Sequence, residues 1–103
     1  MTFPKGFITY PHGVGGIKDD PETQNTYEYG FMTADTKAAI VKWYQDTGPK
    51  YGWTVIPTTS ITDHGSQIVP ALQLENADKT EVMSLDILDT NTLTSVMVYM
   101  TKE

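Results

Sequence analysis

Two histidines and their neighbours are the residues of this 103-residue sequence that could take part in catalysis or bind a metal. His64 follows Asp63 and precedes Ser66 by two positions, so one short segment holds the three residue types of a serine triad. Triads draw their members from separate elements of a fold, and three neighbours on one loop do not make the required chain of hydrogen bonds. The segment is therefore interpreted as a polar turn, and no catalytic residue is predicted.

A metal site would need these histidines to meet in space. His12 and His64, joined by Asp63 or Asp19, would make an accepted set of ligands. The sequence contains no His-x-x-x-His or similar metal-site spacing. The acidic run at residues 19–22 lacks the alternating oxygen ligands and the central glycine of a calcium loop, and the absence of cysteine removes disulfides and thiolate sites. We therefore predict no metal and no cofactor.

Phosphate and nucleic acid are poor partners for this sequence. The glycine-rich segment from His12 to Lys18 lacks the spacing of a phosphate loop, since Asp19 follows the lysine and no helix pattern begins there. The net charge is −6, and all seven basic residues are lysines without a single arginine. Nucleic-acid binding usually requires a basic patch, so no nucleic-acid partner is predicted.

Aromatic residues are numerous for one small domain, at 11% of the sequence. Most of them must form the core, because aromatic side chains dominate the energy of burial. An exposed subset could stack on a sugar or another flat ligand. Trp43 and Trp53, with the loop histidines His12 and His64, are the candidate ligand-binding residues, although Trp53 is expected first as a structural anchor after Gly52.

The helix and strands that carry these residues follow from the periodicity of the apolar positions. Residues 25–33 alternate as a half-buried strand, and residues 34–46 carry a helical stripe formed by Ile40, Val41 and Tyr44, with Thr33 as the expected N-cap. Strands are then predicted over residues 53–58, 67–75, 80–88 and 93–101, with a polar loop over 58–66. The predicted fold is α+β, with one main helix packed on one face of a mostly antiparallel sheet of about five strands in the order β-α-β-β-β-β.

The length fits one domain. Residues 1–24 are predicted to form an extended N-terminal arm, with a short strand at 6–10, and residues 25–103 a single α+β domain. One helix covers only one face of a sheet, and the last strand is apolar on both sides. We therefore expect the arm, through Phe3, Phe7, Ile8 and Tyr10, or else a second copy of the protein, to cover the face away from the helix.

Several short motifs resemble those of small exported bacterial domains, often lipoproteins, that are mostly of unknown function. The motifs are Tyr10-Pro11, the Thr33-Ala34-Asp35-Thr36 helix start, Trp43-Tyr44, and Gly52-Trp53. His12-Gly13 departs from the small residues usual after Tyr-Pro, and no lipobox cysteine is present. The resemblance implies an extracytoplasmic α+β domain, periplasmic or on the cell surface after leader removal. It carries no catalytic residues.

The expected function is that of a non-enzymatic exported domain that acts through protein–protein interaction or self-assembly. The alternative is a small-molecule or carbohydrate binding module that uses exposed aromatics, and an enzyme is the weakest of the three hypotheses. No stretch approaches the roughly eighteen apolar residues of a membrane span, so no span is predicted. The N-terminal residues carry no apolar signal-peptide core, which leaves a cytoplasmic location open.

Overall fold

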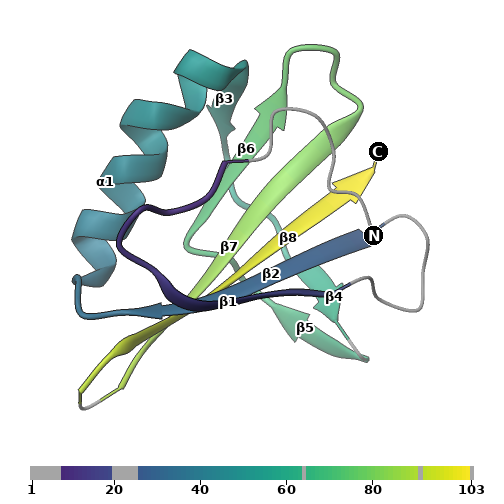
Figure 1. Ribbon diagram of the computed structural model, residues 1–103. Coiled ribbons are helices and arrows are strands. Elements are labelled where there is room, and N and C mark those ends of the chain that lie inside the picture. The colour runs from purple at the N-terminus through teal and green to yellow at the C-terminus, as the bar shows by residue number, and fades with distance from the viewer. Residues whose placement is uncertain (1–7, 20–25, 64, 91, 103) are drawn as a thin grey trace.

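The computed structural model describes residues 8–19, 26–63, 65–90 and 92–102 (Figure 1). The strands within these residues are β1 (Val14–Asp19), β2 (Thr26–Thr33), β3 (Trp53–Ile56), β4 (Ile61–Asp63), β5 (Ser66–Ile68), β6 (Leu72–Asn76), β7 (Glu81–Asp89) and β8 (Thr94–Lys102). The helix α1 (Lys37–Thr47) continues into the 3-10 turn η1 (Gly48–Tyr51).

Within the described residues, six strands form one antiparallel sheet in the order β1-β2-β8-β7-β6-β3. Helix α1 lies across one face of this sheet, here called the helix face, and the β4–β5 hairpin lies beyond the opposite, outer face (Figure 1). The predicted α+β architecture, a helix on an antiparallel sheet, is confirmed. The strand count and order differ, because β1 was not predicted and β4 and β5 form a separate small sheet.

The helix begins three residues later than predicted. Thr33 is the last residue of β2, and its side-chain oxygen accepts a hydrogen bond from the backbone N–H of Asp35 (3.2 Å). Thr36 is the N-cap instead, because its Oγ1 accepts from the backbone N–H of Ala39 (3.2 Å). Each threonine thus bonds a nearby N–H, and the first bond makes a turn whereas the second starts the helix.

Two glycines shape the passage from the helix to β3. Gly48 has no room for a side chain, because a Cβ there would lie 2.6 Å from Leu74 Cδ2 and 3.4 Å from Trp53 Cβ. Gly52 ends η1 at φ +89°, in the left-handed region that glycine adopts without strain. The predicted role of Gly52 as a terminating residue before Trp53 is confirmed.

The core lies between α1 and the helix face of the sheet. Ile40 and Tyr44 on the helix are fully buried, and Val41 packs against the same cluster while partly exposed. The sheet contributes the alternate apolar residues of the strands predicted over 67–75 and 80–88, namely Leu72, Leu74, Met83, Leu85 and Ile87. The registers Leu72↔Leu85 and Leu74↔Met83 place these side chains side by side, so the predicted core is confirmed.

The strand predicted over residues 67–75 is two strands. Residues 66–68 turn back on Ile61–Asp63 to form the β4–β5 hairpin, and the main sheet resumes only at Leu72. Pro70, which is buried between them, has no N–H to donate to a ladder and so interrupts the pairing. The polar loop predicted over 58–66 contains β4 and the start of β5.

The N-terminal segment lies on the helix face, not on the outer face as expected. Ile8 and Tyr10 are buried in the core cluster with Phe31 and Tyr44. Phe31 lies on the helix face of the sheet, beside its register partner Val96, so Ile8 and Tyr10 lie on that face too. Residues 8–10 have no regular structure, and the strand of this segment is β1, at residues 14–19. Phe3, Phe7 and the expected boundary at residue 24 lie outside the described residues.

Candidate functional site

The four candidate ligand-binding residues have different surroundings. Trp53 is 2% exposed and lies against Gly48 at the start of β3, as expected of a structural anchor. Trp43 is partly buried at the edge of the core cluster. The side chain of His12 is 68% exposed, and His64 lies outside the described residues. Of the four, His12 and Trp43 therefore offer surface to a ligand.

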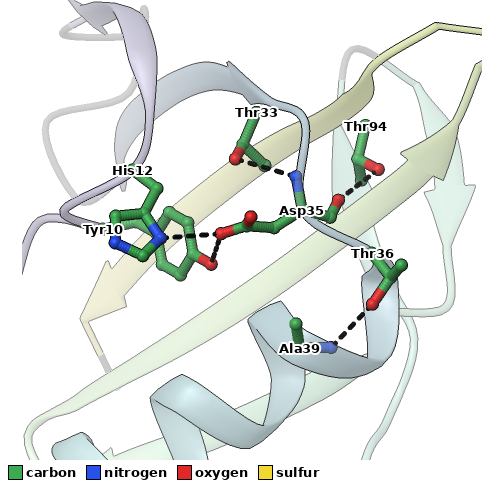
Figure 2. A network of polar contacts seen from close by, with 7 residues as sticks. All are labelled: Tyr10, His12, Thr33, Asp35, Thr36, Ala39 and Thr94. Atoms are coloured by element: carbon green, nitrogen blue, oxygen red, sulfur yellow. Dashed lines mark hydrogen bonds and ion pairs between the residues drawn. The ribbon is translucent and has the colours of Figure 1, made fainter.

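A polar cluster joins the N-terminal segment to the loop before α1. It consists of Tyr10, His12 and Asp35, and is called the Asp35 cluster below. The Tyr10 hydroxyl donates a hydrogen bond to Asp35 Oδ2, and His12 Nδ1 lies 2.9 Å from the same oxygen. Figure 2 shows Tyr10 and His12 pointing from one segment toward this single carboxylate. Asp35 therefore links the N-terminal segment to the start of α1.

The backbone of Asp35 is fixed on both sides. Its N–H donates to Thr33 Oγ1, and its carbonyl oxygen accepts from Thr94 Oγ1 at 2.8 Å (Figure 2). Thr33 and Thr94 face each other in the β2–β8 register and are both buried. The backbone that carries the Asp35 carboxylate is therefore fixed by the strands β2 and β8 as well as by its own loop.

The charges of the cluster are set by these contacts. The hydrogen bond from Tyr10, followed by that from His12, lowers the pKa of Asp35 below its ordinary value. Burial, followed by the hydrogen bond to Asp35, raises the pKa of Tyr10 to about 12. At neutral pH, Asp35 is therefore a carboxylate that accepts from a neutral phenol.

Aromatic rings surround the Tyr10 ring. It stacks on Phe31 with ring centroids 5.4 Å apart, and it meets the edges of Trp43 (5.2 Å) and His12 (5.6 Å). His12 and Trp43, two of the candidate ligand-binding residues, thus contact the same ring although they are far apart in the sequence. That ring belongs to Tyr10, which the sequence analysis assigned to the N-terminal arm. Tyr44 stacks nearby, with its ring centroid 6.3 Å from that of Tyr10.

The chemical feature of the Asp35 cluster is the imidazole ring of His12, which the carboxylate of Asp35 holds in one orientation. A carboxylate at Nδ1 fixes the ring of His12, as the acid does in a triad. Among the described residues, no group of three His, Cys, Asp or Glu side chains is placed to hold a metal ion. The geometry also has a structural consequence, because the cluster fastens residues 10–12 to the loop between β2 and α1.

A row of apolar side chains crosses the outer face of the sheet. The pairs Val14↔Met32, Met32↔Ser95 and Ser95↔Leu88 line up one residue from each of β1, β2, β8 and β7. The exposed fractions are 62% for Val14, 37% for Met32 and 65% for Leu88. These four residues are called the outer row. Alternation in the predicted strands 25–33 and 80–88 indicated this face for Met32 and Leu88, whereas Val14 required the β1–β2 register, which a glycine-rich segment conceals.

The remainder of the outer face lies toward the hairpin. Gln73, Ser84 and Tyr99 are buried there, although they project away from the helix. Gln73 Oε1 accepts from the backbone N–H of Thr59 (2.8 Å), which ties the segment before β4 to the sheet. The outer face is thus divided between a region next to the hairpin and the region of the outer row.

No protein family model and no curated protein sequence matches this chain. Among the described residues, no helix has both the length and the apolar character needed to cross a membrane.

Proposed function

We propose that this protein is a non-enzymatic domain that assembles with a second copy of itself through the outer row, outside the cytoplasm. The observation that carries the proposal is the alignment of three exposed apolar side chains across four neighbouring strands. Soluble monomers rarely expose contiguous apolar patches of more than a few hundred Å² without a binding role. The resemblance to exported domains supports the extracytoplasmic location.

The shape of the outer row suits a copy of the same surface. Neighbouring strands lie about 4.8 Å apart, so the row extends for roughly 14 Å. Two sheets stack face to face about 10 Å apart with interdigitating side chains, and a two-fold contact brings the same patch from both partners. Three of the four positions in the row are apolar, so the row is complementary to itself. The β4–β5 hairpin lies over the other region of the outer face, which leaves the region of the outer row for a second sheet.

Charge gives this assembly a distinctive salt dependence. Each copy carries a net charge of −6, so two copies repel one another at long range. Added salt screens that repulsion and leaves the apolar contact intact, since the Debye length falls from about 30 Å at 0.01 M to about 8 Å at 0.15 M. Self-assembly should therefore strengthen with salt. A contact between this acidic surface and a basic partner would weaken instead.

The experiment measures the mass of the protein in solution by sedimentation equilibrium over a range of concentrations and at two salt concentrations. We expect a dimer whose dissociation constant rises at least about tenfold in Leu88→Thr, because a two-fold interface loses the buried side chain twice. Met32→Thr should act in the same direction. The matched control is Val55→Thr, since Val55 is 41% exposed but lies on the far edge strand β3 and on the helix face.

Each outcome bears on the proposal. A monomer at every concentration and salt would refute self-assembly. A dimer weakened equally by Val55→Thr and Leu88→Thr would place the interface away from the outer row, and weakening by added salt would show that charge pairs hold it together.

A further inference from the structure

A second region of the outer face contains a cavity of about 300 Å³ between the hairpin and the sheet. Thr59, Ile61 and Thr62 line it from the hairpin side. Residues of β6, β7 and β8 line it from the sheet side, among them Gln73, Ser84 and Tyr99. The cavity is distinct from the outer row, whose residues do not line it. Small-molecule sites are concave and occupy about 300 Å³ or more, so this volume suits one small ring.

The described residues of the lining are rich in hydrogen-bonding groups and carry no charged side chain. Six of the eight described lining residues bear a hydroxyl or an amide, and the other two are Ile61 and Val82. A phosphate or carboxylate ligand would require a basic group, and an ammonium ligand would require a carboxylate. The eight lining residues named in the described part of the chain supply neither. It instead matches a neutral ligand that has several hydroxyl groups and an apolar edge.

Two buried side chains on the sheet side, those of Gln73 and Ser84, each have one hydrogen left to donate. Gln73 and Ser84 are 2% and 1% exposed. Gln73 Oε1 accepts from the backbone N–H of Thr59, so its Nε2 is the donor to Ser84 Oγ at 2.9 Å. An amide nitrogen carries two hydrogens and a hydroxyl carries one, so a second N–H and the Ser84 O–H remain. Within the described residues no acceptor is seen for either hydrogen, and buried donors normally have one.

We propose that this cavity is a binding site for a single neutral sugar unit. Gln73 Nε2 and the Ser84 hydroxyl donate to sugar oxygens, and the hydroxyls of Thr62 and Thr101 lie in the lining to accept from or donate to sugar hydroxyls. Ile61 and Val82 contact the C–H groups of the ring. Because the site lies beside the hairpin and not on the outer row, sugar binding and self-assembly can be tested separately.

The test uses the full chain and four defined probes, methyl glycosides of glucose, galactose, mannose and N-acetylglucosamine. Each is titrated while backbone amide resonances are followed by two-dimensional NMR. We expect at least one probe to shift the amides of Thr59, Thr62, Gln73, Ser84 and Thr101 in a saturable manner. The amides of the outer row should stay in place.

Two variants and one control locate the binding. Ser84→Ala removes a buried donor and should weaken binding about tenfold. Thr62→Val keeps the side-chain shape at an exposed position, so it preserves the fold and should weaken binding about threefold to tenfold. Thr92→Val is the control, since Thr92 is exposed in the β7–β8 loop and does not line the cavity. Unchanged amides with all four probes, or equal weakening by Thr92→Val and Thr62→Val, would overturn the proposal.

Discussion

Replacing Gly48 by alanine tests how tightly the end of the helix is packed on β6. Gly48 has helical backbone angles (φ −50°, ψ −49°), at which alanine is ordinarily favoured over glycine by about 1 kcal/mol. The added methyl carbon would lie 2.6 Å from Leu74 Cδ2, and Leu74 is fully buried. Forcing an extra methyl group into a filled core costs about 1–3 kcal/mol. The overlap is severe, so we expect a net loss of about 1–2 kcal/mol in the free energy of unfolding.

Leu74→Ala provides the second arm of a double-mutant cycle. That change alone should cost about 2–5 kcal/mol, because it removes a buried side chain and leaves a cavity. In this background the methyl group of Gly48→Ala enters vacated space, so the same substitution should become neutral or stabilising, with a coupling of about 1 kcal/mol or more.

Gly52→Ala is the matched control for the cycle. Apart from its two chain neighbours, no described residue has an atom within 4 Å of a Cβ at Gly52, but its φ of +89° should cost about 1–2 kcal/mol by backbone strain. Leu74→Ala should leave that cost unchanged. Urea unfolding followed by far-ultraviolet circular dichroism measures all the variants, since fluorescence would report the local change beside Trp53. A Gly48→Ala protein as stable as the parent, or an equal loss in both backgrounds, would contradict the close contact.

The other predictions concern the core, the helix start and the Asp35 cluster. Leu85→Ala should lower the free energy of unfolding by about 2–5 kcal/mol, measured by urea titration, and a loss below about 1 kcal/mol would contradict its burial. Thr36→Ala should cost about 1 kcal/mol in the same assay, because Thr36 caps α1. The pKa of Tyr10 is raised from 10.0 to about 12, so its contribution is complete below pH 10 and is lost as pH rises toward 12. The stability advantage of the parent over Tyr10→Phe should therefore shrink across that window, and a constant difference would argue against the contact. The pKa of Asp35 is lowered, so its contribution is present above the ordinary carboxyl pKa and is lost as pH falls below it. Acid titration should thus destabilise the parent more than Asp35→Asn.

Elements with a clear period were predictable from the sequence. The alternation of Tyr27, Tyr29 and Phe31 indicated β2, and the helical stripe of Ile40 and Tyr44 indicated both α1 and the face it buries. The start of the helix was misplaced because Thr33 and Thr36 are equally good capping residues. Only the turn that Thr33 makes with the N–H of Asp35 decides between them.

Elements that depend on pairing were not predictable. In β1, Gly15 and Gly16 read as a turn, and a register irregularity after Val14 hides the alternation. The β4–β5 hairpin has only three residues per strand, too short for a periodic signal. The outer row was not predicted as a row either. Its residues come from four strands, and they line up across the sheet only once the register of each strand pair is fixed.

The Asp35 cluster was indicated only in part. His12 was recognised as a residue able to bind a ligand, and Asp35 was recognised only as part of the Thr33-Ala34-Asp35-Thr36 helix start. Nothing local to either residue shows that they meet. Their contact depends on Tyr10 entering the core beside Phe31, which is a property of the packed fold.

The position of β8 has a consequence for the order in which the chain can fold. β8 lies between β2 and β7, so residues 94–102 provide the only ladder in the described sheet that connects β1 and β2 to the other four strands. The β1–β2 pair must therefore wait, with the edge of β2 unpaired, until residues 94–102 have been synthesised and have left the ribosome. Its ladder partners are far apart in sequence, as in Thr26↔Thr101, and such non-local pairing gives a high contact order and slow folding. During that interval the unpaired edge of β2 can pair with a strand from another chain. A chaperone that binds the nascent chain quickly would block this pairing and so increase the yield of native protein.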